Sequence, residues 1–453
     1  MTNAITTHSA HQLSHSQAQL QDLVAFALEE ARRLGSTQAE AGVSVDTGLS
    51  VTARLGEVET LEYHRDRGMG ITVYRGQRKG SASTADLSAQ AIRDTVAKAY
   101  SIAGFTAEDD CAGLPEPDSM ARDIPDLDLS HPWNIAPDAA RDLAVACEAA
   151  ALAVDKRIGN SEGATLSSHQ GLRVFGNSHG FLNGFPSTMH SLSCVVVAQD
   201  NDEMQRDYWY SSVRDWRELE DGASIGRQAA TRALRRLNAR KLPTSTAPVL
   251  FVPELARGLI GHFLGAIRGS SQYRRASFLL DAAGQQVFPA WMQISERPHL
   301  RKALGSSPFD SEGVATRDRE IVDGGVLTGY VLGTYSARKL GLKSTGNAGG
   351  VHNVLVAPGQ DDFAALLERM DKGLVVTELM GQGVNGVTGD YSRGAAGFWV
   401  EGGELAYPVH EITIAGNLKD IYREIVAVGS DVDPRGGVRT GSILVEKMTV
   451  AGE

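Results

Sequence analysis

The sequence predicts an α+β fold: an α/β N-terminal region with a mixed sheet and flanking helices, then a mostly β C-terminal domain with a few helices. Helical and strand patterns alternate through the first half of the chain, whereas the second half is rich in glycine and in strand-like runs. The 453 residues are enough for two or three domains. Hydrophobic residues make up 42% of the chain, which is ample for extended cores.

Residues 1–242 are expected to form the N-terminal region, with a first segment at 35–103, a linker at 104–137 and a second segment at 138–242. Before the first segment, apolar residues at helical spacing predict a helix over 16–33 that stops at Gly35. Alternating patterns and turn residues then predict a strand-like segment at 49–63, with a reversal of the chain near Gly56. A hairpin of 70–74 with 80–84 and a helix at 90–103 are expected to follow.

The linker is indicated by five prolines at positions 115, 117, 125, 132 and 137. An alanine-rich helix follows at 138–156, with Asp138 as its expected cap. The second segment continues with strands at 172–175, 191–199 and 205–212, and with a helix at 224–239. The main domain boundary is expected near residue 242, before the next strand-rich part of the chain.

Residues 243–453 are expected to form the C-terminal β-rich domain. Pro253 suits the first turn of a helix that runs to Gly269. Paired glycines predict hairpins in 320–331 and 397–408, because glycine supplies the positive backbone angles of a tight turn. A late helix at 417–426 and a closing strand at 442–450 complete the domain.

The helix at 251–269 is the most informative stretch. Its apolar residues form one stripe on a helical wheel: Leu255, Leu259, Phe263 and Ile267, with Ile260 at the edge. Gly258, Gly261 and Gly265 fall together on the opposite face, and each costs the helix about 1 kcal/mol relative to alanine. We therefore expect another backbone to pack closely on this glycine face; a strained helix near a bend is the alternative.

The composition excludes some classes of protein. A formal net charge of −11 argues against a general nucleic-acid binder, which needs a basic face. Three cysteines without a CxxC pair indicate reduced thiols. No signal peptide and no membrane span is visible, so the cytoplasm is the expected location. His8, His11 and His15 are interpreted as part of a solvated tail, since no acidic or sulfur ligand accompanies them.

A serine-hydrolase pattern, G-x-S-x-G, occurs at 176–180 around Ser178. The pattern requires a helix after the serine, but Gly184 and Pro186 follow instead. The segment is therefore predicted to be a hairpin turn, and an independent hydrolase based on Ser178 is the weakest of the functional hypotheses.

Several other residues are candidates for a site. His262 borders the glycine face and is more often a hydrogen-bonded core histidine than a metal ligand; Glu254 lies eight residues earlier, and His299, His352 and His410 are scattered. Arg274 and Arg275 are candidates to bind a phosphate or a peptide carboxylate, but a solvated or interface charge pair is the preferred interpretation. Asp310, Ser311 and Glu312 are candidates to hold a metal, but a turn capped by Asp310 is preferred. Two glycine-rich loops, 343–350 and 381–394, are candidates to line a cleft or to face a partner. Their candidate residues are Asn347, Gly349, Gly350, His352, Gly383 and Asn385.

Four stretches carry a resemblance to a known family: ARGLIGHFLGAIRGSSQYRRASFLLDAAGQQVFP, SSPFDSEGVATRDREIVDGGVLTGYVLGTYSARKLGLKSTGNAGGVHN, GSILVEKMTVAG and, more weakly, FGNSHGFLNGF. The chain resembles the TldD/PmbA family, on its TldE/PmbA branch, over nearly its whole length. In that family the TldD branch carries a helical H-E-x-x-x-H motif and a late cysteine that bind a metal. The TldE/PmbA branch lacks the metal.

Residues 257–262 align with that motif. Arg257 replaces the first histidine, Gly258 replaces the glutamate, and only His262 remains; no cysteine follows Cys194. An arginine does not release its proton to bind a metal, and glycine has no side chain to act as a base. No metal, cofactor or catalytic residue is therefore expected in this chain, and the resemblance implies that zinc is held by a TldD-like partner.

The resemblance thus implies that this chain is the non-metal-binding subunit of a heteromeric metalloprotease. Such a complex would degrade unfolded peptides and trim peptide precursors of the microcin type. The alternative is a non-catalytic, regulatory homodimer with no protease role. An older family description is a modulator of DNA gyrase; the acidic charge indicates that any such link is indirect, without direct nucleic-acid contact.

Overall fold

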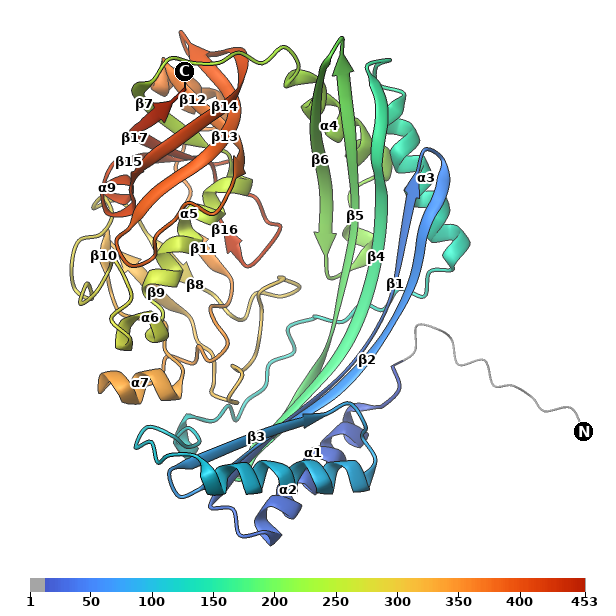
Figure 1. The fold of residues 1–453 in the computed structure, drawn as a ribbon, viewed down its shortest axis with the longest axis vertical. Coiled ribbons are helices and arrows are strands. Elements are labelled where there is room, and N and C mark those ends of the chain that lie inside the picture. The colour runs from blue at the N-terminus through green and yellow to red at the C-terminus, as the bar shows by residue number, and fades with distance from the viewer. Residues whose placement is uncertain (1–12, 453) are drawn as a thin grey trace, which may run out of the picture.

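The computed structural model describes residues 13–452, so His8 and His11 lie outside the described residues. The chain forms two bodies that face each other, a long curved sheet with its helices and a compact C-terminal body (Figure 1). No helix among residues 13–452 is long and apolar enough to cross a membrane.

The N-terminal body is built on six long strands. Its elements are α1 (Gln17–Arg33), β1 (Gln38–Arg54), β2 (Glu57–Arg75), β3 (Arg78–Thr84), α2 (Ala89–Phe105), the 3-10 helix η1 (Pro117–Ser119), α3 (Pro137–Leu152), β4 (Ile158–Asn177), β5 (Leu182–Asp200), β6 (Glu203–Val213), the 3-10 helix η2 (Trp216–Glu218) and α4 (Gly222–Arg235). The sheet order is β3-β2-β1-β4-β5-β6. Every neighbouring pair is antiparallel, which corrects the expected mixed sheet of this region.

The four helices of this body cover one face of the sheet. Along β1 the odd-numbered residues are buried, and they supply two cores: residues 39–45 pack with α1 and α2, and residues 49–53 pack with α3 and α4. Small residues let α3 and α4 approach closely, since a Cβ at Gly226 would collide with the carbonyl of Cys147. The other face of the sheet is turned toward the C-terminal body (Figure 1).

Local signals set most element ends. Ser16 caps α1 in a capping box with Gln19, and Gly35 follows the helix with a φ of 89°. Leu55 and Gly56 form the turn between β1 and β2, as predicted for Gly56. The expected cap of α3 is wrong: Pro137 begins that helix after Ala136, so Asp138 lies in the first turn.

The C-terminal body contains two sheets. Its elements are β7 (Ser245–Phe251), α5 (Pro253–Ala266), α6 (Gly269–Tyr273), β8 (Ile294–Glu296), β9 (Arg319–Asp323), β10 (Val326–Leu327), α7 (Thr334–Leu340), β11 (Val354–Val356), α8 (Phe363–Met370), β12 (Gly373–Met380), β13 (Asp390–Glu401), β14 (Glu404–Asn417), α9 (Leu418–Arg423), β15 (Ile425–Val428), β16 (Val438–Arg439) and β17 (Ile443–Ala451). One sheet has the order β14-β13-β12-β7-β17-β15 and the other β10-β9-β8-β11-β16. The first curls on itself, because β14 also pairs with β17.

The predicted α+β class is confirmed. Parallel pairing occurs in the C-terminal body, between β7 and β12 and between β11 and β16, rather than in the N-terminal sheet. The hairpins expected at Gly324 and Gly402 are present as β9–β10 and β13–β14, and both glycines have positive φ.

Candidate functional site

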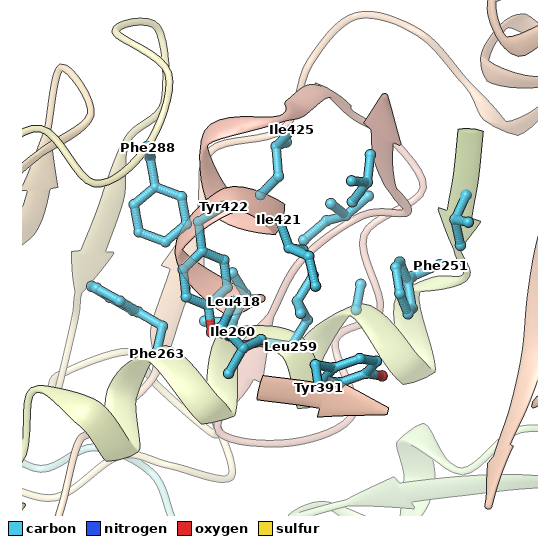
Figure 2. Packing of buried hydrophobic residues seen from close by; sticks show 14 of the residues in the cluster. Phe251, Leu259, Ile260, Phe263, Phe288, Tyr391, Leu418, Ile421, Tyr422 and Ile425 are labelled. Atoms are coloured by element: carbon cyan, nitrogen blue, oxygen red, sulfur yellow. Dashed lines mark hydrogen bonds between the residues drawn. The ribbon is translucent and has the colours of Figure 1, made fainter. Parts of the chain in front are cut away.

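Helix α5 is held in the C-terminal body by its apolar stripe. Leu259, Ile260 and Phe263 are buried, as predicted, and Figure 2 shows them directed toward α9. Phe263 stands edge-on to Phe288 with ring centroids 4.9 Å apart. The fully buried Tyr422 of α9 donates its hydroxyl proton to the carbonyl of Leu259 at 3.0 Å. These contacts fix which face of α5 remains open.

That open face carries the three glycines. Gly258, Gly261 and Gly265 are exposed, and a Cβ at any of them would meet no neighbouring atom within 4 Å. The expectation that another backbone of this chain packs there is therefore wrong for residues 13–452. All three positions lie within α5, which runs from Pro253 to Ala266 and ends one residue after Gly265.

A cavity of about 360 Å³ lies on the glycine face. From α5 it is lined by Gly261, His262 and Gly265. Residues of the 381–389 loop and of β13 also line it. The other lining residues are Ala266, Ser271, Ala276, Phe278, Gln382, Val384, Gly386, Arg393 and Leu418. The structure thus joins the glycine face to one of the two predicted loops.

His262 is half-buried at the edge of this cavity. Its ring lies 6.1 Å from the ring of Tyr391 in an edge-on arrangement. Burial, and then the positive charge of Arg393, lower the pKa of His262 below its usual value. Both effects favour the neutral imidazole.

Arg257 connects α5 to the N-terminal sheet. One Nη donates to the carbonyl of Arg435 at 2.7 Å, and the other donates to the hydroxyl of Tyr210 at 3.1 Å. Asp433 lies 3.9 Å from the same guanidinium. Arg257, which aligns with the first histidine of H-E-x-x-x-H, thus uses its guanidinium in hydrogen bonds that hold the fold together.

These residues do not fit a metal ion. The Arg257 guanidinium offers no lone pair, Gly258 has no side chain, and His262 alone can supply one nitrogen, whereas zinc requires three or four ligands. Among residues 13–452, no group of three or more His, Cys, Asp or Glu side chains is placed to hold a metal.

The second predicted loop lies around a different, smaller cavity of about 140 Å³, lined by Gly349, Gly350 and His352. Asn347 instead anchors the loop: its amide donates to Glu296 at 2.7 Å, and the His352 backbone N–H donates to the same carboxylate at 2.6 Å. Burial acts to raise the pKa of Glu296, but its contacts with His352 and Arg319 outweigh burial and lower it.

Asp310 borders the 140 Å³ cavity and caps the backbone, as predicted. Its carboxylate accepts N–H bonds from Glu312, Val314 and Ala348 at 2.9–3.0 Å. Burial nevertheless raises the pKa of Asp310 to about 6.

Gly383 and Asn385 shape the 381–389 loop rather than line the α5 cavity. A Cβ at Gly383 would collide with the carbonyl of Ser392. The Asn385 side chain accepts backbone N–H bonds from Val387 at 2.9 Å and Thr388 at 3.2 Å, which closes the turn.

The serine pattern is the hairpin turn that the sequence predicts. The Ser178 hydroxyl accepts the backbone N–H of Ala39 at 3.0 Å, between β4 and β5. No histidine is hydrogen-bonded to Ser178 among the described residues, so the arrangement lacks a general base for the hydroxyl.

Sequence reasoning missed Gln382, Arg393 and Phe278, which complete the α5 cavity. The 381–394 loop was singled out as a whole for its glycines, so composition located the segment but not its lining side chains. Phe278 carried no separate signal, because an isolated aromatic residue in a loop is most often part of a core.

Comparisons with known proteins agree along most of the chain. Residues 39–103 match the PmbA/TldA metallopeptidase domain 1, residues 130–237 the central domain, and residues 244–452 the C-terminal domain of the same family. Metalloprotease PmbA of Escherichia coli O157:H7 is 54% identical over 96% of each chain. A Metalloprotease PmbA homolog of Haemophilus influenzae is 50% identical over 97% of this chain and 98% of its own.

Solved structures share the fold. A crystal structure from Bacteroides thetaiotaomicron, described as a proposed modulator of DNA gyrase, superposes with a TM-score of 0.91 at 28% identity, covering 95% of this chain and 98% of that one. TldE from Thermococcus kodakarensis gives a TM-score of 0.82 at 21% identity, over 96% of this chain and 100% of its own, and supports the fold alone. Sequence and structure together establish that this chain belongs to the PmbA/TldD metallopeptidase family, on its TldE/PmbA branch.

Proposed function

We propose that this chain is the non-metal-binding subunit of a heteromeric metalloprotease whose TldD-like partner holds the zinc and carries out the cleavage. The observation that carries the proposal is Arg257. It stands where the first histidine of H-E-x-x-x-H would be, and its guanidinium is committed to the Arg435 carbonyl and the Tyr210 hydroxyl. A zinc-bound water and a general base therefore have to come from another chain.

The glycine face gives this subunit a role beside the scissile peptide. Three interior glycines cost α5 roughly 3 kcal/mol relative to alanine, yet no atom of the described chain occupies the space that this leaves. An extended peptide backbone, or the partner's surface, can approach closely only where side chains are absent. The α5 cavity adds hydrogen-bonding groups at Ser271, Gln382 and Arg393.

Unfolded peptides are the substrate class that fits this face. A backbone held in a helix or sheet has its N–H and C=O groups already paired, whereas an unfolded segment can pair them with a protein surface. We place the complex in the cytoplasm, where it would degrade unfolded chains and trim precursor peptides of the microcin type.

The test measures zinc content and cleavage of an unstructured peptide for this chain alone, for a TldD-like protein encoded in the same genome, and for the two mixed. The expected result is that this chain alone binds no stoichiometric zinc and cleaves nothing, and that mixing raises the partner's activity. Stoichiometric zinc together with cleavage by this chain alone would contradict the proposal.

The alternative, a regulatory homodimer without a protease role, makes a different prediction in the same experiment. The two proteins would then fail to co-elute in size-exclusion chromatography, and this chain would leave the partner's cleavage rate unchanged.

A further inference from the structure

A second and larger cavity lies at the junction of the two bodies, outside the α5 glycine face. Its volume is about 550 Å³, within the range that holds ligands of several hundred daltons. It is walled by the end of β6, by η2, by the first turn of α5 and by the loop before β16, which reaches toward β6 in Figure 1. Trp209, Val213, Leu304 and Val432 give it apolar surface.

Two arginines in this wall have no carboxylate partner among residues 13–452. Arg214 donates its Nη atoms to the backbone carbonyls of Thr188 at 2.9 Å and Leu304 at 2.8 Å, and its buried Nε has no acceptor. The Arg439 guanidinium makes no hydrogen bond and no ion pair within the described residues, and its Nε is also buried without an acceptor. Burial lowers the pKa of both groups, as desolvation of an uncompensated cation requires.

The carboxylates of the same wall do not neutralise these arginines, because each is engaged elsewhere. Asp433, which acts on Arg439 only through space, is hydrogen-bonded to Arg435 at 2.8 Å. The other pairs are Glu254 with Arg232 at 3.3 Å, Glu218 with Lys302 at 2.7 Å, Glu220 with the indole N–H of Trp209 at 3.0 Å and Asp431 with the hydroxyl of Ser442 at 2.6 Å.

This arrangement is complementary to a singly charged carboxylate. Partial burial of a guanidinium without a counter-charge costs desolvation free energy, which a bound anion would offset. The planar guanidinium can also donate two parallel hydrogen bonds to the two oxygens of a carboxylate. The surrounding acidic side chains repel a doubly charged phosphate about twice as strongly as a singly charged carboxylate, so they favour the carboxylate. The apolar wall offers contact for the residue that bears the carboxylate.

We propose that this cavity binds the C-terminal carboxylate of a peptide, with Arg439 as its donor and Arg214 as a second, fixed positive charge. The peptide as the source of the carboxylate rests on the proposed function. A free small carboxylic acid has the same chemistry, and the experiment separates the two. The cavity would hold one end of a chain whose middle lies in the protease complex.

The experiment uses the isolated full chain and an unstructured fluorescent peptide, prepared with a free C-terminus and with an amidated one. Because hydrogen bonds to charged groups contribute roughly tenfold or more in affinity, the free acid should bind at least about tenfold more tightly than the amide. Acetate should compete only at much higher concentration, and inorganic phosphate should compete no better than acetate. Arg439→Gln should reduce binding of the free acid to the level of the amide.

The matched control is Arg122→Gln, since Arg122 is an exposed arginine that pairs with Asp118 on the surface, and this variant should bind like the unmodified chain. Arg439→Lys keeps the positive charge but loses the planar guanidinium, so this variant should bind the free-acid peptide with intermediate affinity. This second variant keeps the test decisive if Arg439→Gln does not fold. Equal binding of acid and amide by the unmodified chain would overturn the proposal. Binding of acetate as tight as that of the peptide would overturn the peptide assignment, and preference for phosphate would overturn the choice of carboxylate.

The binding test and the test of the proposed function have separate readouts. Peptide binding is measured without the partner and without zinc, whereas the proposed function is tested by zinc content and cleavage in the mixed sample. Failure of the peptide-binding test can therefore be distinguished from failure of the proposed function.

Discussion

The Arg257 guanidinium donates a hydrogen bond to the Tyr210 hydroxyl at 3.1 Å and thereby joins α5 of the C-terminal body to β6 of the N-terminal sheet. The same side chain also holds the loop before β16 through the Arg435 carbonyl. Arg257 therefore connects the two bodies of this chain.

Arg257→Ala should accordingly destabilise the protein. The variant loses two hydrogen bonds and leaves the Arg435 carbonyl without this donor, so we expect the free energy of unfolding to fall by about 1–3 kcal/mol. Tyr210→Phe is the matched control, because it removes one of the two bonds and should cost about 1 kcal/mol or less. Urea denaturation followed by circular dichroism measures both; an unchanged midpoint for Arg257→Ala would show that the connection contributes nothing.

Gly261→Ala and Gly265→Ala should stabilise the isolated chain. Both positions are open and lie in the interior of α5, so each alanine should add roughly 0.5–1 kcal/mol through helix propensity alone. In the mixed complex the same methyl groups should slow peptide cleavage, because they occupy the face on which we place the peptide or the partner.

Gly383→Ala is the contrasting substitution. Its new methyl group would collide with the Ser392 carbonyl, so this variant should lose stability by about 1–3 kcal/mol rather than gain it. Thermal denaturation of the three variants side by side provides the comparison. A destabilised Gly261→Ala chain would mean that the α5 face is not open.

Local sequence signals were sufficient where one short segment decides the structure. The end of α1 before Gly35, the Gly56 turn and the Pro253 helix start were predictable, because each depends on residues within one turn of the chain. The apolar stripe of α5 was predictable for the same reason. The continuity of β2 was not predictable, since residues 57–63 and 70–74 were expected as separate strands and the exposed, polar residues His64–Arg67 between them give no alternating pattern.

Relations between distant segments could not be read from one sequence. A helical wheel places the α5 glycines on one face but cannot say what faces them, and the inferred close neighbour is absent from the described chain. Arg393 reaches the same cavity from a strand more than a hundred residues later. Likewise, the lack of carboxylate partners for Arg214 and Arg439 becomes visible only when the positions of all nearby acidic side chains are known.

Asp310 should make stability depend on pH in the acidic range. Its pKa is raised by burial to about 6 in the folded chain, compared with about 3.9 in an unfolded one. The folded state thus binds this proton more tightly, so the contribution of Asp310 is fully present below pH 4 and is lost as the pH rises through 6. The change across this window should be on the order of 2–3 kcal/mol.

The measurement is the free energy of unfolding of the unmodified chain and of Asp310→Asn between pH 4 and 7. The asparagine side chain of the variant cannot titrate, so the difference between the two proteins should itself change with pH, with the unmodified chain gaining relative stability toward pH 4. The introduced amide also places a donor near the Ala348 N–H, which lowers stability at every pH without altering the slope. A difference that stays constant across the range would show that Asp310 does not titrate there.

Restoring the motif should not restore a metal site. The double variant Arg257→His, Gly258→Glu recreates H-E-x-x-x-H with His262, but it supplies two histidines and a base where zinc needs a third protein ligand. No cysteine follows Cys194 in this chain to complete the set. We therefore expect the double variant to bind zinc weakly and substoichiometrically, and to remain inactive alone. The control is Arg257→Ala with Gly258→Ala, which matches the loss of the interbody contacts and offers no ligand. Atomic absorption after dialysis measures the zinc content of both variants. Stoichiometric zinc in the Arg257→His, Gly258→Glu variant, but not in the alanine control, would show that a further ligand lies closer to α5 than the present arrangement places it.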